Sequence, residues 1–310
     1  MCQIIAALGQ YTQQCTTETE GNTDNFHQCS PLVQKENGDK KYPDRLQGIE
    51  YGTTDRRRLT DTQQIAEHKT IHAEFIRNAD RSRPFMAFMF FESPHAPYEF
   101  PEEAVIRKEY AQELNYAKVS SGDGTMIKNR YINSNHHLDM RLAEVFKALD
   151  DGNLWENTIV VLVGDHGEEF YEKGRLGHNS TFVQEQVRTP LVIHIPGVKP
   201  QVYTGMSSHL DVVPILAPYF GVTNPIADYS LGYNLLDPAQ KRTYTIIANW
   251  SQVFYASPKY KTLLPSNSIA FATQKLTDGN DNPLPSLDPF YNENKAELFQ
   301  IQRDLTRFVK

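Results

Sequence analysis

Residues 157–168 read Asn157-Thr-Ile-Val-Val-Leu-Val-Gly-Asp-His-Gly-Glu168, and this stretch carries most of the information about the fold. From Thr158 to Val163 it is a short apolar run, which is typical of a strand buried on both faces of a parallel sheet. Gly164-Asp165-His166-Gly167 comes next, at the tip of that strand. Ligands of open α/β sheets bind beyond the carboxyl ends of the strands, so this tip is a candidate functional site.

Two further apolar runs predict strands on either side of this stretch. Residues 85–91 are continuously apolar and lead into Glu92-Ser-Pro-His-Ala-Pro-Tyr98, so His95 lies at a second strand tip. Pro190-Leu-Val-Ile-His-Ile195 is the third run. Asp165, His166 and His95 thus lie at two strand tips. This placement predicts a functional site at the carboxyl edge of the sheet.

Helices are expected between and around these strands. Apolar residues recur at helical spacing from Met126 to Asp150, and shorter patterns predict helices from Asp61 to Asn78 and from Leu210 to Phe220. Strands that alternate with helices predict an α/β fold, a doubly wound sheet with helices on both faces.

The ends of the chain differ from this middle part. Residues 1–60 are polar and weakly patterned, which predicts irregular surface structure, and residues 61–240 form the predicted α/β core. Residues 241–310 predict a small antiparallel β subdomain, with strands at 243–248, 251–257 and 268–274. An amphipathic helix from Asn294 to Val309 is expected to cap it through its apolar residues Ala296, Leu298, Phe299, Leu305 and Phe308.

The composition of the chain excludes several classes of function. The chain has 310 residues, a formal net charge of -7 and 39% hydrophobic residues, which excludes a disordered chain and argues against a general nucleic-acid binder. No apolar run approaches the roughly 18–20 residues that span a bilayer, so any membrane anchor is expected outside this sequence. Cys2, Cys15 and Cys29 do not have zinc-site spacing; a Cys15–Cys29 disulfide and three unrelated thiols both stay open.

Adjacent Asp165 and His166 predict a metal site on chemical grounds. A strand tip with a glycine on each side lets a carboxylate oxygen and an imidazole nitrogen turn toward one cation, and lets a substrate approach closely. The competing interpretation is an Asp-His pair that caps a turn or lies on the surface.

The Asp-His tip belongs to a wider series of motifs. In order, these are Arg83-Pro-Phe85, Ser93-Pro-His-Ala-Pro-Tyr98, Tyr131-Ile-Asn-Ser-Asn-His-His-Leu-Asp139, Gly164-Asp-His-Gly-Glu168, Gly174-Arg-Leu-Gly-His178, Val187-Arg-Thr-Pro190 and Ser208-His-Leu-Asp211. Over about residues 80–225 this series resembles the sulfatase branch of the alkaline-phosphatase superfamily. It is closest to the extracytoplasmic sulfatase-like domains of membrane-anchored envelope proteins of the lipoteichoic-acid-synthase kind.

The resemblance implies metal-assisted hydrolysis or transfer at sulfur or phosphorus. It implies that Asp165 and His166 bind a divalent cation, which is Ca, Mn, Mg or Zn. It implies that His95 and His178 bind the ester or protonate the leaving group, and that Arg175 is a basic substrate contact. The implied substrate is a sulfate or phosphate ester, with a lipid headgroup as one candidate, and the implied location is extracytoplasmic, in the periplasm or at the outer face of the inner membrane. Membrane association is expected only through a segment absent from this chain.

One half of the family pattern is missing. The family's first strand carries acidic metal ligands and precedes a Thr, Ser or modified Cys nucleophile, and nothing between Met1 and Thr60 has that form; Cys29-Ser-Pro-Leu-Val33 lacks the required Arg. A C-terminal portion of a membrane-anchored enzyme is the first interpretation. An inactive relative that binds a lipid headgroup or a protein is the alternative, and an N-terminal region with substitute groups is the third. A metal-dependent phosphomutase is disfavoured because its larger ligand set is not visible.

Other polar residues have structural interpretations. His194, in an apolar strand, is expected to be a satisfied core histidine. His136 and His137 are expected to bond along a helix face or to solvent, with Asp139 as a partner. Asp211 is expected at a helix N-terminus rather than in catalysis. Glu168 and Glu169 are expected in solvent, with support of His166 as a second role for Glu168. The basic run Arg56-Arg57-Arg58 is expected to be a solvated turn, with contact to anionic headgroups as the other interpretation.

Overall fold

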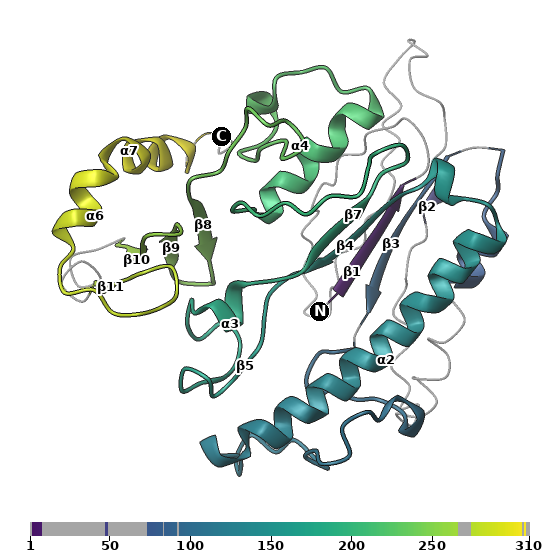
Figure 1. Cartoon of the computed structure of the whole chain (residues 1–310), viewed down its shortest axis with the longest axis horizontal. Helices are drawn as coiled ribbons and strands as arrows, with labels where there is room; N and C mark the ends of the chain where they lie inside the picture. The colour runs from purple at the N-terminus through teal and green to yellow at the C-terminus, as the bar shows by residue number, and fades with distance from the viewer. Residues whose placement is uncertain are drawn as a thin grey trace, which may run out of the picture. The chain divides into compact units, whose positions relative to one another are not determined.

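The structure is a computed structural model that describes residues 2–7, 47–48, 73–82, 84–91, 93–265, 274–305 and 307 (Figure 1). The chain divides into two compact units. The first consists of Met1–Leu176 and Thr189–Lys199, and the second of Gly177–Arg188 and Pro200–Lys310.

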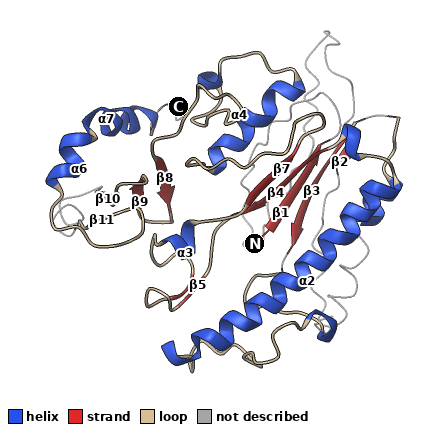
Figure 2. Ribbon diagram, in the orientation of Figure 1, coloured by secondary structure: helices blue, strands red, loops and turns tan. Residues whose placement is uncertain are grey.

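A five-stranded sheet is the centre of the first unit (Figure 2). Its order is β2-β3-β1-β4-β7, with β1 (Cys2–Ala7), β2 (Gln47–Gly48), β3 (Phe85–Phe91), β4 (Ile159–Gly164) and β7 (Leu191–His194). The three strands expected from apolar runs are confirmed within one or two residues at each end. Strands β1 and β2 are additions, because they lie in the stretch whose polar composition predicted irregular structure.

The pairing of these strands differs from the parallel pattern that their apolar character suggests. Strand β1 pairs antiparallel with both β3 and β4, β4 pairs antiparallel with β7, and among these described strands only β2 with β3 is parallel. Strand β4 is buried along nearly its whole length, but Phe88 of β3 is 44% exposed and Val192 of β7 is 57% exposed, so an apolar run reports neither strand direction nor burial on both faces. Because β3 and β4 are both antiparallel to β1, they point the same way and end at the same edge.

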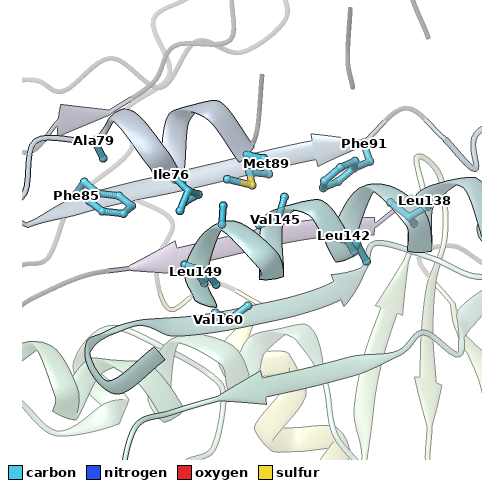
Figure 3. Close-up of a cluster of buried hydrophobic side chains, with 13 residues drawn as sticks. Ile76, Ala79, Phe85, Met89, Phe91, Leu138, Leu142, Val145, Leu149 and Val160 are labelled. Carbon is cyan, nitrogen blue, oxygen red and sulfur yellow. The ribbon is translucent and has the colours of Figure 1, made fainter. Parts of the chain in front are cut away.

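Helix α2 (Gly124–Asp151) covers one face of this sheet (Figure 1). Its apolar residues recur at helical spacing and are buried, as the sequence pattern predicts. They meet β3, β4 and the helical residues 73–78, the described part of the helix expected from Asp61 (Figure 3). The cluster consists of Ala73, Ile76, Ala79, Phe85, Ala87, Met89, Phe91, Leu138, Leu142, Val145, Ala148, Leu149 and Val160.

Short elements connect these parts. Strands β5 (Glu169–Phe170) and β6 (Leu176–Gly177) form a two-stranded sheet after β4. Helix α3 (Gln184–Val187) belongs to the second unit. The 3-10 helices are η1 (Glu102–Ala104), η2 (Ser121–Asp123), η3 (Trp155–Asn157), η4 (His209–Asp211), η5 (Ala217–Phe220) and η6 (Ile226–Asp228), and α4 (Val212–Leu216) joins η4 to η5 where one helix was expected.

The second unit contains the expected antiparallel sheet, with four strands in the order β11-β10-β9-β8. They are β8 (Thr245–Ala248), β9 (Val253–Ala256), β10 (Lys261–Leu264) and β11 (Leu276–Thr277). The sheet packs through Tyr255, Tyr260 and Leu276 against Phe290 and Ile301 of two helices. The strand predicted at 268–274 lies, except for its last residue, outside the described residues.

The helix predicted from Asn294 to Val309 begins where expected, at the junction of two described helices. Helix α6 (Asp288–Glu293) ends and α7 (Lys295–Asp304) begins on either side of Asn294, whose Nδ2 donates to Phe290 O at 2.8 Å. Ile301 is the buried residue of α7, whereas Phe299 is 69% exposed and Leu305 is 55% exposed. Ala296 is also exposed, so the predicted apolar face is wrong at three positions; Leu298 packs against the hydrophobic cluster of this unit, and Phe308 lies outside the described residues.

A hydrogen bond between sheet and helix stabilises the second unit. Tyr255 Oη donates to Glu297 Oε2 at 2.5 Å, and burial, followed by this bond, raises the pKa of Tyr255. We expect Tyr255→Phe to lower the free energy of unfolding by about 1.5–3 kcal/mol, because a bond to a charged acceptor is lost.

The difference in free energy of unfolding between wild type and Tyr255→Phe should become smaller above about pH 10. Above this pH Tyr255 ionises in the unfolded state but stays neutral in the folded state. The free energy of unfolding of wild type therefore falls with pH, whereas the phenylalanine of the variant has no proton to lose. Denaturant unfolding at pH 7 and 10.5 measures both effects. Tyr219→Phe, at a 40% exposed tyrosine, is the control, and an equal loss in both variants would contradict the assignment.

Candidate functional site

The two strand tips singled out from the sequence lie at one edge of the sheet. Phe91 of β3 and Gly164 of β4 both stand opposite Cys2 of β1 in the strand register. The tips are therefore level and two strand spacings apart, which is about 10 Å. Residues 93–100 and 165–168 leave the sheet from neighbouring points within the first unit.

Polar residues on one face of α2 hold the loop that carries His95. Arg130 Nε donates to Pro97 O at 2.7 Å, and its Nη2 pairs with Glu99 Oε1 at 3.0 Å. Ser134 Oγ lies 3.0 Å from Ser93 Oγ. His95 itself is exposed, with Nδ1 at 2.8 Å from Ala96 O. The loop backbone is thus fixed by buried groups while the imidazole of His95 faces outward.

Asp165 and His166 turn toward each other directly after β4. Asp165 Oδ1 accepts a hydrogen bond from His166 N at 3.1 Å, and Asp165 Oδ2 lies 3.7 Å from His166 Nε2. His166 Nδ1 is 2.8 Å from Gly167 O. The side chains are 33% and 28% exposed, so a solute can reach both.

This geometry suits a pair of metal ligands. An imidazole that donates Nδ1–H to a backbone carbonyl presents Nε2 to a cation, which is the arrangement commonly found at metal-binding histidines. Two ligand atoms bound at about 2.1 Å to one cation stand about 3.0–3.4 Å apart, so the 3.7 Å separation of Asp165 Oδ2 and His166 Nε2 needs only a small adjustment. One oxygen and one nitrogen donor fit several divalent ions.

Tyr98 connects the two loops. Its Oη donates to Glu168 Oε1 at 2.9 Å, and its backbone N donates to His95 O at 2.8 Å. The ring is fully buried against Tyr131 and Phe170. Burial, followed by the charge of Glu168, raises the pKa of the Tyr98 hydroxyl, so it acts as a donor. The sequence motif contained Tyr98 but carried no signal for this role, because its partner is 70 residues away.

The two glutamates after the Asp-His pair are less solvated than predicted. Glu168 is half-buried and accepts the bond from Tyr98. Glu169 is completely buried, and its Oε1 accepts from Lys173 N at 3.0 Å and Arg175 N at 2.7 Å. The expectation of a solvated Glu169 is therefore wrong, because this carboxylate closes the turn between β5 and β6.

The remaining candidate residues lie in and after this turn. The backbone of Arg175 is held from both sides, since Arg175 N donates to Glu169 and Arg175 O accepts from Tyr171 N at 2.7 Å. Its residue position is exposed. His178 comes directly after β6 and is half-buried as the second residue of the second unit. The roles of both residues stay predictions.

The structural interpretations are confirmed for His194 and Asp211, whereas His137 is not in solvent and His136 bonds to a carbonyl outside its own helix. His194 Nε2 lies 3.2 Å from Trp155 O, and its ring packs on the edge of Trp155, as expected for a core histidine. His136 Nδ1 lies 2.9 Å from Ala104 O, and His137 is buried. Asp211 is completely buried and pairs with Arg242. Cys15, Cys29 and the basic run 56–58 lie outside the described residues.

Comparisons with known proteins agree with this architecture. The sulfatase family model matches residues 5–222. Lipoteichoic acid synthase 1 of Bacillus subtilis is 27% identical over 147 residues, which cover 45% of this chain and 21% of that protein. Inner membrane protein YejM of Salmonella typhimurium is 27% identical over 169 residues, which cover 51% of this chain and 28% of that protein. The chain thus spans less than a third of either relative.

A solved structure shows the same fold. The candidate sulfatase yidJ of Bacteroides fragilis superposes with a TM-score of 0.56 and 18% identity, over 79% of this chain and 58% of the other. None of the helices in the described ranges combines the length and hydropathy that crossing a bilayer requires. The family model covers well over half of the chain and the fold agrees with it, so the chain belongs to the sulfatase family, with an alkaline-phosphatase-like α/β core.

Proposed function

We propose that the chain acts in metal-dependent hydrolysis or transfer of a sulfate or phosphate ester, and that Asp165 and His166 hold the divalent cation. The observation that carries this proposal is the pair itself: Asp165 Oδ2 and His166 Nε2 lie 3.7 Å apart, half-exposed, at the carboxyl end of β4. The loop of His95 leaves the sheet at the same edge.

Each side chain has a task in this reaction. The bound cation supplies charge that stabilises the ester oxygens. Gly167 O orients the His166 ring through Nδ1. The Tyr98 hydroxyl donates to the carboxylate of Glu168, which follows His166 by two residues, and so fixes its position. His95 is exposed and its loop is fixed, so its imidazole can give a proton to a leaving oxygen. His178 and Arg175 contact the ester anion.

The site is proposed to take its ester outside the cytoplasm, at the periplasm or the outer face of the inner membrane. The names of two relatives support this location, since one is a lipoteichoic acid synthase and the other an inner membrane protein. The donor set of one oxygen and one nitrogen leaves Ca, Mn, Mg and Zn as candidate ions. A lipid headgroup and a smaller ester are both within this substrate class.

Metal titration tests the proposal. With Mn²⁺ or Zn²⁺ at 100 times its dissociation constant, the free energy of unfolding of the wild-type chain should rise by about 2.7 kcal/mol. Asp165→Asn removes the charged ligand and should lose most of this gain. Asp151→Asn is the matched control, because Asp151 is an exposed aspartate that pairs with Lys147 on the helix surface.

The result is read from calorimetry and thermal melts of the three chains. An equal rise in the free energy of unfolding in wild type and Asp165→Asn would mean that the cation binds at other residues. No gain in wild type with either ion, nor with Ca²⁺ or Mg²⁺, would overturn the metal-dependent function.

A further inference from the structure

Glu168 follows the Asp-His pair by two residues and lies close to it within the first unit. The residue is half-buried, and one of its carboxylate oxygens lies within 4.8 Å of a ring nitrogen of His166. Two ligands on opposite sides of one cation stand about 4.2–4.8 Å apart when each bond is about 2.1–2.4 Å long. A cation that His166 binds is therefore within reach of Glu168 as well.

The carboxylate of Glu168 is held on a rigid support. Tyr98 Oη donates to Glu168 Oε1 at 2.9 Å, and the side chain of Tyr98 is fully buried. The Tyr98 ring packs against Tyr131 and Phe170, with ring centroids 5.4 Å and 5.9 Å away. A carboxylate offers lone pairs for about four contacts, so it can accept the bond from Tyr98 and bind a cation at the same time.

The backbone on both sides of Glu168 is fixed as well. Gly167 O lies 2.8 Å from His166 Nδ1 on one side. On the other side Glu169 is completely buried, and its Oε1 accepts hydrogen bonds from two backbone amides of the following turn. The contacts of its neighbours and of Tyr98 therefore keep the carboxylate of Glu168 beside His166.

The charge of Glu168 needs an explanation beyond the hydrogen bond from Tyr98. Three carboxylates, those of Asp165, Glu168 and Glu169, lie within five residues of the chain. Like charges this close raise the free energy of the folded state, and a positive charge among them lowers it. As an acceptor for Tyr98 alone, the neutral amide of a glutamine would serve without this repulsion. A divalent cation at this tip gives the negative charge a function.

We propose that Glu168 is a third ligand of the cation at Asp165 and His166, and that Tyr98 is the residue that positions it. The inference rests on the proposed function and extends the site from two donors to three. It also gives the buried hydroxyl of Tyr98 a task, because this hydroxyl joins the loop of His95 to the loop of the cation ligands.

Mn²⁺ is the probe, and its dissociation constant is measured by calorimetry. Glu168→Gln and Tyr98→Phe should each bind Mn²⁺ about tenfold more weakly than wild type, because a metal site loses affinity when a ligand or its hydrogen-bond partner is removed. The double variant should bind no more weakly than Glu168→Gln alone, since Tyr98 acts on the cation only through Glu168. Glu172→Gln is the matched control and should bind as wild type does, because Glu172 pairs with Lys128 at the surface.

Relaxation of water protons shows whether Glu168 contacts the cation directly. In Glu168→Ala a water molecule should take the vacated position on Mn²⁺, so the relaxation rate per bound Mn²⁺ should rise above that of wild type. Weaker binding with an unchanged relaxation rate would mean that Glu168 acts only as a nearby charge, and would overturn its role as a ligand.

The remaining outcomes separate this inference from the function on which it rests. If Mn²⁺ bound wild type, Glu168→Gln and Tyr98→Phe equally but bound Asp165→Asn weakly, the inference would be overturned while the proposed function stands. A loss of about a hundredfold in the double variant would mean that Tyr98 acts independently of Glu168, and would overturn its positioning role. Binding of none of the four candidate cations by wild type would overturn both.

Discussion

Asp211→Ala is expected to lower the free energy of unfolding by about 3–5 kcal/mol, the range for breaking a buried ion pair from one side. Asp211 is completely buried and the side chain of its partner Arg242 is 4% exposed. Arg242 bonds both carboxylate oxygens. The same carboxylate accepts from Ser208 N at 2.7 Å and from Tyr233 N at 2.8 Å, so its removal leaves a guanidinium and two amides without their acceptor.

Urea unfolding followed by circular dichroism measures this loss. Lys147–Asp151, an exposed pair one helical turn apart, is the matched control, and Asp151→Ala should cost about 0.3–0.5 kcal/mol. Asp211→Asn keeps the shape and some of the bonds, so it should lose less than alanine and stay folded. If Asp211→Ala cost no more than Asp151→Ala, the pair would not contribute to stability as the buried contacts require.

Arg130→Met is expected to lower the free energy of unfolding by about 2–4 kcal/mol, because several acceptors lose their bond to a buried guanidinium. The guanidinium of Arg130 donates to the carbonyl oxygens of Pro97, Ala111 and Gln112 at 2.7–3.0 Å. It also pairs with Glu99. Methionine fills the space of the side-chain stem but donates no hydrogen bond, so the loop of His95 should open first.

Hydrogen exchange locates this effect. The amide of Tyr98, which bonds to His95 O, should exchange faster in Arg130→Met, whereas the amides of Ile106 and Arg107, which donate to Asn133 Oδ1, should keep most of their protection. Lys128→Met is the control on the same helix, since Lys128 is half-exposed and pairs with Glu172 at the surface. Uniform loss of protection across all three amides would mean that Arg130 stabilises the whole unit and does not position the loop.

Apolar patterning predicted the principal elements of the first unit. The sequence located strands β3, β4 and β7 and helix α2. A continuous apolar run is typical of a strand, and apolar residues at helical spacing are typical of a helix that packs on a core. The tips after β3 and β4 were predicted for the same reason, since locating a strand also locates the loop at its carboxyl end. The order of the motifs over about residues 80–225, Asp165 and His166 among them, indicated the family.

Long-range polar partners had no such pattern. Glu169 is an ordinary acidic residue in the sequence, and its burial depends on two backbone amides across a turn. Tyr98 and Glu168 are 70 residues apart, and Arg130 meets carbonyl groups 18–33 residues before it. Strand β1 was missed because a six-residue stretch that includes the polar Gln3 and adjoins polar sequence does not reveal which strands it will pair with.

The family, the principal strands and helices, and the strand tips that carry the candidate site could all be predicted from the sequence, because hydrophobic period and motif order are local properties of the chain. The antiparallel insertion of β1 between β3 and β4, the burial of Glu169 and Asp211, and the bond from Tyr98 to Glu168 became known only from the folded structure. Strand direction and the partner of a buried polar group depend on which distant segments of the chain come into contact. Because a buried polar group without a partner costs free energy, the chain favours the arrangement in which such groups are paired.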